Sequence, residues 1–267
     1  MAVTLAAQVA IAIENARLYQ AVRQQEDQLE RDLAMAREVQ LRLLPKAAPN
    51  LPHAELAVRF LPARSIGGDL YDFIDYGSGQ MAIVLGDVSG KAAPAALFAA
   101  LVSGIMRSAA LHHPEPAEML VQLNDSIRER KLESQYVTLL FALWDDHART
   151  LRVANSGAVQ PILCREGASQ TIKAEGFPLG LLPGADYDEL TIETLPGDVL
   201  IFVSDGILDA ENPQGEMYGQ QRLSQMLCSH RQDPPQLLAD AILADVARFQ
   251  NENERFDDET LVVLKVL

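Results

Sequence analysis

Four short acidic segments carry the side chains of this sequence that are best suited to chemistry. Taken singly, an Asp-Gly or Gly-Asp pair is ordinary turn chemistry. Each segment, however, lies beside an apolar run that could form a buried strand, and loops at strand ends commonly hold functional groups on a rigid scaffold. The segments are Gly67-Gly68-Asp69, Gly86-Asp87-Val88, Ser204-Asp205-Gly206 and Asp257-Asp258-Glu259.

Carboxylates that converge at the end of a folded core need a positive partner, because they are poorly solvated and repel one another. Mg²⁺ and Mn²⁺ are the hard cations that prefer an all-oxygen donor set. Zinc is not indicated, because the sequence has no cluster of His or Cys residues. Two cations that share a carboxylate convert a bridging water to hydroxide near neutral pH and screen the charge of a phosphoryl group. The acidic segments therefore predict metal-dependent hydrolysis of a phosphate ester.

The composition is that of an acidic globular protein. The 267 residues are 48% apolar and carry a formal net charge of -15, so the positive field that attracts nucleic acid or an anionic membrane is missing. Cys164 and Cys228 are far apart and in no CxxC spacing. This predicts neither a disulfide nor a thiolate metal site, and it fits a reducing cytosol. No signal peptide or run of about 20 apolar residues occurs, so we expect a cytoplasmic protein without a membrane span.

A long helix is predicted for the first part of the chain. Residues 5–44 contain no Gly or Pro, and prolines at positions 45, 49 and 52 end the helical pattern. Apolar residues recur every seven positions at Val22, Leu29, Ala36 and Leu43, which is typical of a coiled coil. We expect two copies of the chain to associate through this helix; the alternative is that it lies on its own domain.

Beyond the prolines, β-rich runs alternate with helical segments. Hairpin-like neighbours and consecutive helix pairs favour antiparallel sheets covered by helices over a doubly wound parallel sheet. The helical segment 94–111 is apolar nearly all round, and we expect it to be buried. The predicted strands are 56–61, 81–88, 137–144, 151–155, 161–164, 190–194, 199–204 and 261–266, and the predicted helices are 94–111, 116–131, 219–229 and 235–251.

The acidic segments also carry a family resemblance. From Ala36 to Leu267 the sequence resembles metal-dependent, type 2C-like (PPM) Ser/Thr protein phosphatases of the bacterial SpoIIE/RsbU branch. The matching motifs occur in the family's order: IGGDLYDF (66–73), GDVSGK (86–91), PGDVLIFVSDGILDAEN (196–212) and DDETLVV (257–263). The resemblance implies an α+β fold, a four-layer α-β-β-α sandwich of two antiparallel sheets flanked by helices.

A division of the chain follows from the resemblance. We expect a helical coiled-coil linker at residues 1–46 and a phosphatase domain at residues 47–267. The segment from Leu5 to Tyr19 also resembles the last helix of a GAF-type sensor domain, so the linker is expected to join a sensor to the phosphatase domain. The alternative is that its apolar residues simply pack locally.

The resemblance further implies two Mn²⁺ or Mg²⁺ ions and the residues that hold them. Asp87 would bridge the ions, Asp69 would contact one of them either directly or through another ligand, and Asp205 and Asp257 would complete the pair. Val88 would contribute its carbonyl oxygen. Of the supporting residues, Gly68 and Gly206 would permit close backbone approach and Asp258 would orient the site.

Two further positions concern the substrate. Relatives have a His two residues after the bridging aspartate, and Ser89 stands there in this sequence, so protonation of the leaving group is expected from metal-bound water. Arg64 lies five residues before Asp69, where relatives hold phosphate; the alternative is an ordinary surface arginine.

The substrates implied by this branch are small phosphorylated anti-sigma-factor antagonists of the STAS type, which act in partner switching. The alternative is a catalytically silent dimeric module that only binds a phosphoprotein. Hydrolysis of small phosphates or nucleotides is a third possibility, but no Gly-rich GxxxxGK loop supports it.

Overall fold

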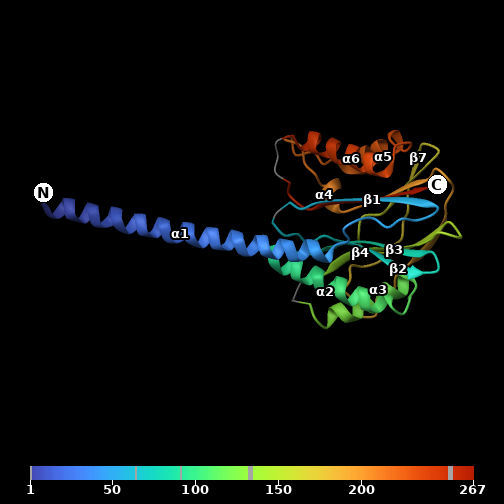
Figure 1. Ribbon diagram of the computed structural model, residues 1–267, viewed down its shortest axis with the longest axis horizontal. Helices are drawn as coiled ribbons and strands as arrows, with labels where there is room; N and C mark the ends of the chain where they lie inside the picture. The colour runs from blue at the N-terminus through green and yellow to red at the C-terminus, as the bar shows by residue number, and fades with distance from the viewer. Residues whose placement is uncertain (1, 64, 91, 132–134, 252–254) are drawn as a thin grey trace.

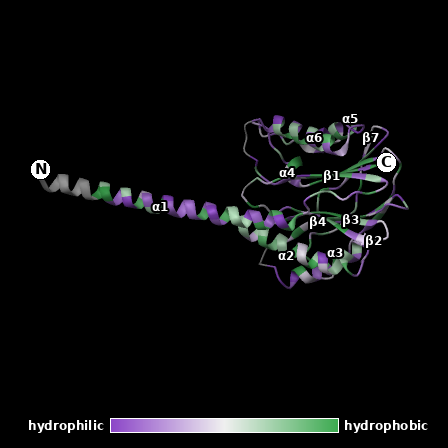
Figure 2. Ribbon diagram, viewed as in Figure 1, coloured by the Kyte–Doolittle hydropathy of each residue, from purple (hydrophilic) through white to green (hydrophobic). Residues whose placement is uncertain are grey.

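A computed structural model describes residues 2–63, 65–90, 92–131, 135–251 and 255–267. A long helix, α1 (Ala2–Leu43), projects from a body of stacked sheets and helices (Figure 1). The helix confirms the prediction for residues 5–44, where no residue breaks helical geometry. Figure 2 shows hydrophobic residues interspersed among hydrophilic ones along α1. Leu18, Val22 and Leu29 are exposed, so the predicted coiled-coil seam has no cover within one chain.

Two five-stranded sheets form the body, and every pair of neighbouring strands is antiparallel. Sheet A has the order β1-β10-β9-β6-β7, and sheet B has the order β2-β3-β4-β5-β8. The strands of sheet A are β1 (Ala54–Leu61), β10 (Glu259–Val266), β9 (Val199–Val203), β6 (Ile162–Arg165) and β7 (Ala168–Thr171). Those of sheet B are β2 (Leu70–Gly77), β3 (Gln80–Val88), β4 (Val137–Asp145), β5 (Thr150–Ser156) and β8 (Glu189–Glu193).

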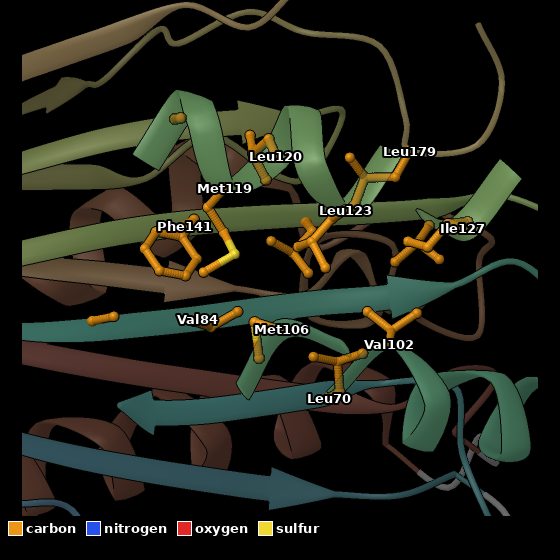
Figure 3. Close-up of a cluster of buried hydrophobic side chains, with 14 of the residues drawn as sticks. Leu70, Val84, Val102, Met106, Met119, Leu120, Leu123, Ile127, Phe141 and Leu179 are labelled. Carbon is orange, nitrogen blue, oxygen red and sulfur yellow. The ribbon is translucent and has the colours of Figure 1, made fainter. Parts of the chain in front are cut away.

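Helices cover both outer faces and confirm the four-layer α-β-β-α architecture. The helices of the body are α2 (Ala92–Ala110) and α3 (Pro116–Arg128) over sheet B, and α4 (Asp205–Leu208), α5 (Gly219–Ser229) and α6 (Pro235–Gln250) on the side of sheet A. Hydrophobic clusters lie under each helical layer and between the sheets. Figure 3 shows the cluster under α2 and α3, where Phe141 of β4 packs near Met106 and Met119.

The structure adds strands and corrects the expected burial of one helix. β2 and β7 were not predicted, because β2 begins inside an acidic motif and β7 has only four residues, three of them exposed. Helix α2 is not buried on all sides: Phe98 and Met106 face the core, while Leu97 is 73% exposed. The expectation was wrong because alanines make this helix apolar all round even where nothing covers it. By length and composition α2 could also cross a membrane, but its inner face packs on sheet B.

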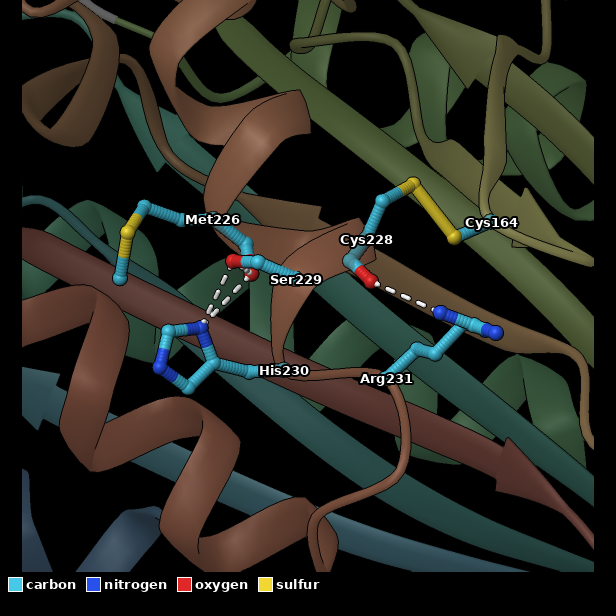
Figure 4. Close-up of a disulfide and its surroundings, with 6 residues drawn as sticks. All are labelled: Cys164, Met226, Cys228, Ser229, His230 and Arg231. Carbon is cyan, nitrogen blue, oxygen red and sulfur yellow. Dashed lines mark hydrogen bonds between the residues drawn. A yellow bond between two sulfur atoms is a disulfide. The ribbon is translucent and has the colours of Figure 1, made fainter.

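The two cysteines give a second correction. Cys164 of β6 and Cys228 of α5 form a disulfide, with their Cα atoms 5.8 Å apart (Figure 4). The prediction that no disulfide is encoded was wrong, because helix α5 packs against β6 and brings together residues that are distant in the chain. Cysteine usage therefore no longer supports a reducing compartment.

Candidate active site

Strand pairing in sheet B brings two of the acidic segments together. In the β2–β3 pair, Leu70 lies opposite Gly86. One step beyond this pair, Asp69 at the entrance of β2 comes beside Asp87 near the end of β3. The antiparallel register alone therefore places these two carboxylates at the same end of sheet B.

Strand pairing in sheet A gathers the other two segments. The N–H of Ser204, which follows β9, donates to the carbonyl oxygen of Thr260 on β10 at 3.0 Å. Asp205 comes next in the chain, so it lies beside the segment with Asp257 that precedes β10. The Thr260 hydroxyl also donates to a carboxylate oxygen of Asp69. This hydrogen bond joins the acidic end of sheet A to that of sheet B.

Glycines permit the close approach of the backbone to these carboxylates. A Cβ on Gly68 would lie 2.8 Å from Oδ1 of Asp87 and 2.8 Å from the carbonyl oxygen of Val88. A Cβ on Gly206 would overlap the carbonyl oxygen of Asp258. Only a residue without a side chain fits at either position.

Asp258 is buried and holds the loop that leads into β2. One oxygen of its carboxylate accepts the N–H of Ala63 at 2.9 Å, and the other accepts the N–H of Asp69 at 3.4 Å. Its own N–H donates to Oδ1 of Asp257 at 2.9 Å. Because backbone donors occupy both of its oxygens, the Asp258 side chain serves to place the neighbouring aspartates.

The electrostatics of the site are those of crowded carboxylates. Burial raises the pKa of Asp87 to about 7, and repulsion from Asp205 and Asp257 contributes to the rise. Burial also raises the pKa of Asp69 well above its usual range, with a further contribution from Asp87. The pKa of Asp205 is raised by desolvation and by repulsion from Asp257. Without a positive partner, the site resists carrying its full negative charge.

The donor set fits a hard divalent cation. Oδ1 of Asp87 and the carbonyl oxygen of Val88 both border the space that a side chain at Gly68 would fill. A cation there would offset the burial and the carboxylate repulsion that raise the pKa of Asp87. Among the described residues, no three His, Cys, Asp or Glu side chains are gathered closely enough to hold a metal ion by themselves. Backbone carbonyl oxygen and solvent would therefore have to complete the coordination.

A cavity of about 450 Å³ opens beside two of the carboxylates. Asp205 and Asp257 form part of its wall, together with Asp209. The exposed side chains of Met217 and Phe256 also line it. A ligand can therefore reach the candidate metal-binding carboxylates from solvent.

Every predicted site residue within the described part of the chain lies at this end of the sandwich: Asp69, Asp87, Val88, Asp205, Asp257, Asp258, Gly68 and Gly206. Arg64 lies outside the described residues. The hydroxyl of Ser89 accepts the N–H of Tyr136 at 2.8 Å.

Sequence reasoning missed two hydroxyl side chains of the site. Thr260 binds Asp69, and the hydroxyl of Ser204 donates to the carbonyl oxygen of Asp258 at 3.0 Å. Both residues lie within the acidic motifs, and that position is the signal that could have assigned them a role. Their partners, however, lie in other segments of the chain.

Comparison with known proteins agrees with this geometry. The family model of Stage II sporulation protein E (SpoIIE) matches residues 77–267. Protein IcfG of Synechocystis sp. is 28% identical over 262 residues, with 87% of this chain and 41% of IcfG covered. Phosphoserine phosphatase RsbU of Bacillus subtilis is 23% identical over 252 residues, with 92% of this chain and 73% of RsbU covered. This chain thus spans less than half the length of IcfG.

Among solved structures, the SiaA-PP2C domain of Pseudomonas aeruginosa has the same fold. Its TM-score is 0.83 at 22% sequence identity, with 91% of this chain and 98% of that domain covered. The family match covers well over half of the chain, including the segments with Asp87, Asp205 and Asp257. The chain therefore belongs to the SpoIIE family and has the fold of PP2C phosphatase domains.

Proposed function

We propose that this protein is a Mn²⁺- or Mg²⁺-dependent phosphoserine/phosphothreonine protein phosphatase. The observation that carries the proposal is the gathering of Asp69, Asp87, Asp205 and Asp257 at one end of both sheets, beside a solvent-accessible cavity. Membership of the SpoIIE family and the similarity to RsbU, which is named a phosphoserine phosphatase, support it.

Two cations would be held by the oxygens of this end of the sandwich. Asp69, Asp87, Asp205 and Asp257 would hold them through carboxylate oxygens, with Asp87 as the shared ligand, and Val88 would contribute its carbonyl oxygen. Bound there, the cations would supply a hydroxide nucleophile near neutral pH and screen the charge of the phosphoryl group.

The chain's own residues prepare this site. Asp87 must give up its proton before it can bind a cation, because its pKa is raised to about 7. Thr260 keeps the Asp69 carboxylate oriented through its hydroxyl. Asp258 holds the loop before β2 through two backbone N–H groups. Gly68 leaves room at the Asp87 carboxylate.

The phosphorylated protein would enter through the cavity beside Asp205 and Asp257. We propose a phosphorylated STAS-type anti-sigma-factor antagonist as its substrate, in a partner-switching pathway. Arg64 is proposed as the phosphate-binding side chain.

The proposed organisation is a homodimer that forms through residues 5–44. In this arrangement residues 1–46 form the linker and residues 47–267 the phosphatase domain. The exposed apolar residues of α1, among them Leu18 and Leu29, support the dimer.

The alternative function is a catalytically silent module that only binds a phosphoprotein. The following experiment distinguishes this module from a phosphatase.

Mn²⁺-dependent hydrolysis of an aryl phosphate tests the activity. The wild type should be active only with Mn²⁺ or Mg²⁺, and Asp87→Asn and Asp205→Asn should each lose at least about 100-fold in kcat/KM, because each removes a charged ligand. Asp188→Asn, at an exposed loop aspartate, is the matched control and should retain full activity.

Equal rates in the wild type and both site variants, or no hydrolysis in any of them, would contradict the proposal. The substrate is tested separately, by incubating the protein with phosphorylated STAS-domain proteins and measuring the loss of phosphate by mass spectrometry. A protein that hydrolyses the aryl phosphate but none of these phosphoproteins would keep the activity and remove the proposed substrate.

A further inference from the structure

Gln40 is the buried exception on a solvent-exposed helix. Among the described side chains of α1, residues 11–43, it alone is buried, with 8% of its surface exposed. A buried amide group is costly unless its donor and its acceptor both find partners. The partners of Gln40 therefore indicate why a polar residue occupies this position.

Both halves of the Gln40 amide bind the backbone of Gly67. The side-chain nitrogen Nε2 donates to the carbonyl oxygen of Gly67 at 2.7 Å. The side-chain oxygen Oε1 accepts the N–H of Gly67 at 3.2 Å. Two complementary hydrogen bonds to one residue restrain its orientation as well as its position.

Gly67 belongs to the loop that forms one wall of the candidate metal site. A Cβ at Gly67 would overlap the carboxylate of Asp258. The next residue, Gly68, packs against the Asp87 carboxylate, and its carbonyl oxygen accepts the N–H of Val88 at 3.3 Å. Asp69 follows directly. A movement of Gly67 would therefore displace the backbone on which Asp69 is carried.

We propose that Gln40 is a positioning residue for the metal site. By holding Gly67 through its two hydrogen bonds, it fixes the loop that places Gly68 and Asp69, and in this way it sets the affinity of the site for the cations. This inference rests on the proposed function, because it presumes that cations bind there. Gln40 itself contacts neither the cations nor the substrate.

The structure offers a control for general loosening of the end of α1. The hydroxyl of Tyr71, on β2, donates to the carbonyl oxygen of Pro45 at 3.1 Å, just after α1 ends. The Tyr71→Phe variant removes this anchor without touching Gly67. Gln24→Ala removes a glutamine from an exposed position of the same helix, far from the loop that contains Gly67. It controls for the removal of a glutamine from α1 as such.

The test measures Mn²⁺ affinity by isothermal titration and by electron paramagnetic resonance of free Mn²⁺, with the full chain. Gln40→Met keeps the length and burial of the side chain but removes both hydrogen bonds, and Gln40→Ala removes the side chain. We expect each variant to bind Mn²⁺ about tenfold more weakly, the size of effect that the loss of buried hydrogen bonds produces. Gln24→Ala and Tyr71→Phe should stay within about twofold of the wild-type affinity.

A second measurement follows the loop itself. In the metal-free Gln40 variants, hydrogen–deuterium exchange of peptides covering residues 65–70 should be faster than in the wild type.

Three outcomes would overturn the proposal. If Gln40→Met binds Mn²⁺ as the wild type does, Gln40 does not position the site. If Tyr71→Phe weakens binding as much as Gln40→Met, general seating of α1 matters and the contact with Gly67 does not. A wild-type protein that binds no Mn²⁺ would remove the proposed function and this inference together, whereas loss of the Gln40 effect alone would leave the proposed function intact.

Discussion

Replacing Asp87 with asparagine should stabilise the metal-free protein at pH 8 while removing its response to Mn²⁺. Burial and the neighbouring carboxylates Asp205 and Asp257 raise the pKa of Asp87 to about 7. A carboxyl group with a raised pKa favours the folded state only while it is protonated. Asparagine has nearly the same size and carries no charge at any pH.

The sign and size of the effect follow from the protons bound in each state. Between the ordinary pKa of 3.8 and about 7, Asp87 keeps its proton in the folded protein but loses it in the unfolded chain. The free energy of unfolding therefore falls as the pH rises through this interval. Above pH 7 the decrease in stability is complete. At about 1.4 kcal/mol for each pH unit, this interval sets an upper limit of about 4 kcal/mol. Side chains and solvent relax around a charge, so we expect Asp87→Asn to gain about 1–3 kcal/mol, or about 3–10 °C in Tm.

Thermal unfolding followed by circular dichroism, after removal of metal with a chelator, measures this effect. The Tm of the Asp87→Asn variant should exceed that of the wild type at pH 8, and most of the difference should disappear at pH 4.5. Added Mn²⁺ should raise the Tm of the wild type at pH 8 and leave that of the variant unchanged. A variant less stable than the metal-free wild type at pH 8, or a difference that is the same at both pH values, would refute the reasoning.

Four other predictions address the site, the core, the disulfide and the helix. Gly68→Ala should weaken Mn²⁺ binding at least about tenfold in isothermal titration, because its Cβ would lie 2.8 Å from a carboxylate oxygen of the site. Gly104→Ala, where an added Cβ would meet no packing neighbour outside its own helix within 4 Å, should bind Mn²⁺ normally. Phe141→Ala should lower the free energy of unfolding in urea by about 3–5 kcal/mol, and a loss below about 1 kcal/mol would contradict the packing in Figure 3. The unreduced protein should show no free thiol to Ellman's reagent after denaturation, and Cys164→Ser should lower its Tm. Sedimentation equilibrium should show a dimer at micromolar concentrations that is lost when residues 5–44 are deleted, and a monomeric full chain would remove the coiled-coil prediction.

Much of the fold could be predicted because local patterns decide it. The helix over residues 5–44 follows from the absence of Gly and Pro, and its observed bounds are Ala2–Leu43. The apolar run at residues 199–204 predicts a buried strand, and β9 has five buried residues there. β7 could not be predicted, because a short polar edge strand has no periodic burial to detect.

The sequence alone determined which residues could do the chemistry and in which kind of fold they would be set. Aspartates beside apolar runs, and their resemblance to a phosphatase family, predicted Asp69, Asp87, Asp205 and Asp257 as candidate metal ligands. Turn chemistry, hydrophobic periodicity and charge are properties of neighbouring residues, so a linear pattern records them.

Only the tertiary structure decided which of these residues meet. Three contacts join segments that lie far apart in the chain. They are the hydrogen bond from Thr260 to Asp69, the two hydrogen bonds between Gln40 and Gly67, and the disulfide between Cys164 and its partner cysteine. Such contacts depend on strand register and on how helices are seated on the sheets, which are set by the packing of the whole core. No local pattern carries that information, because the residues next to Thr260, Gln40 or Cys164 in the chain do not indicate which distant residue each will contact.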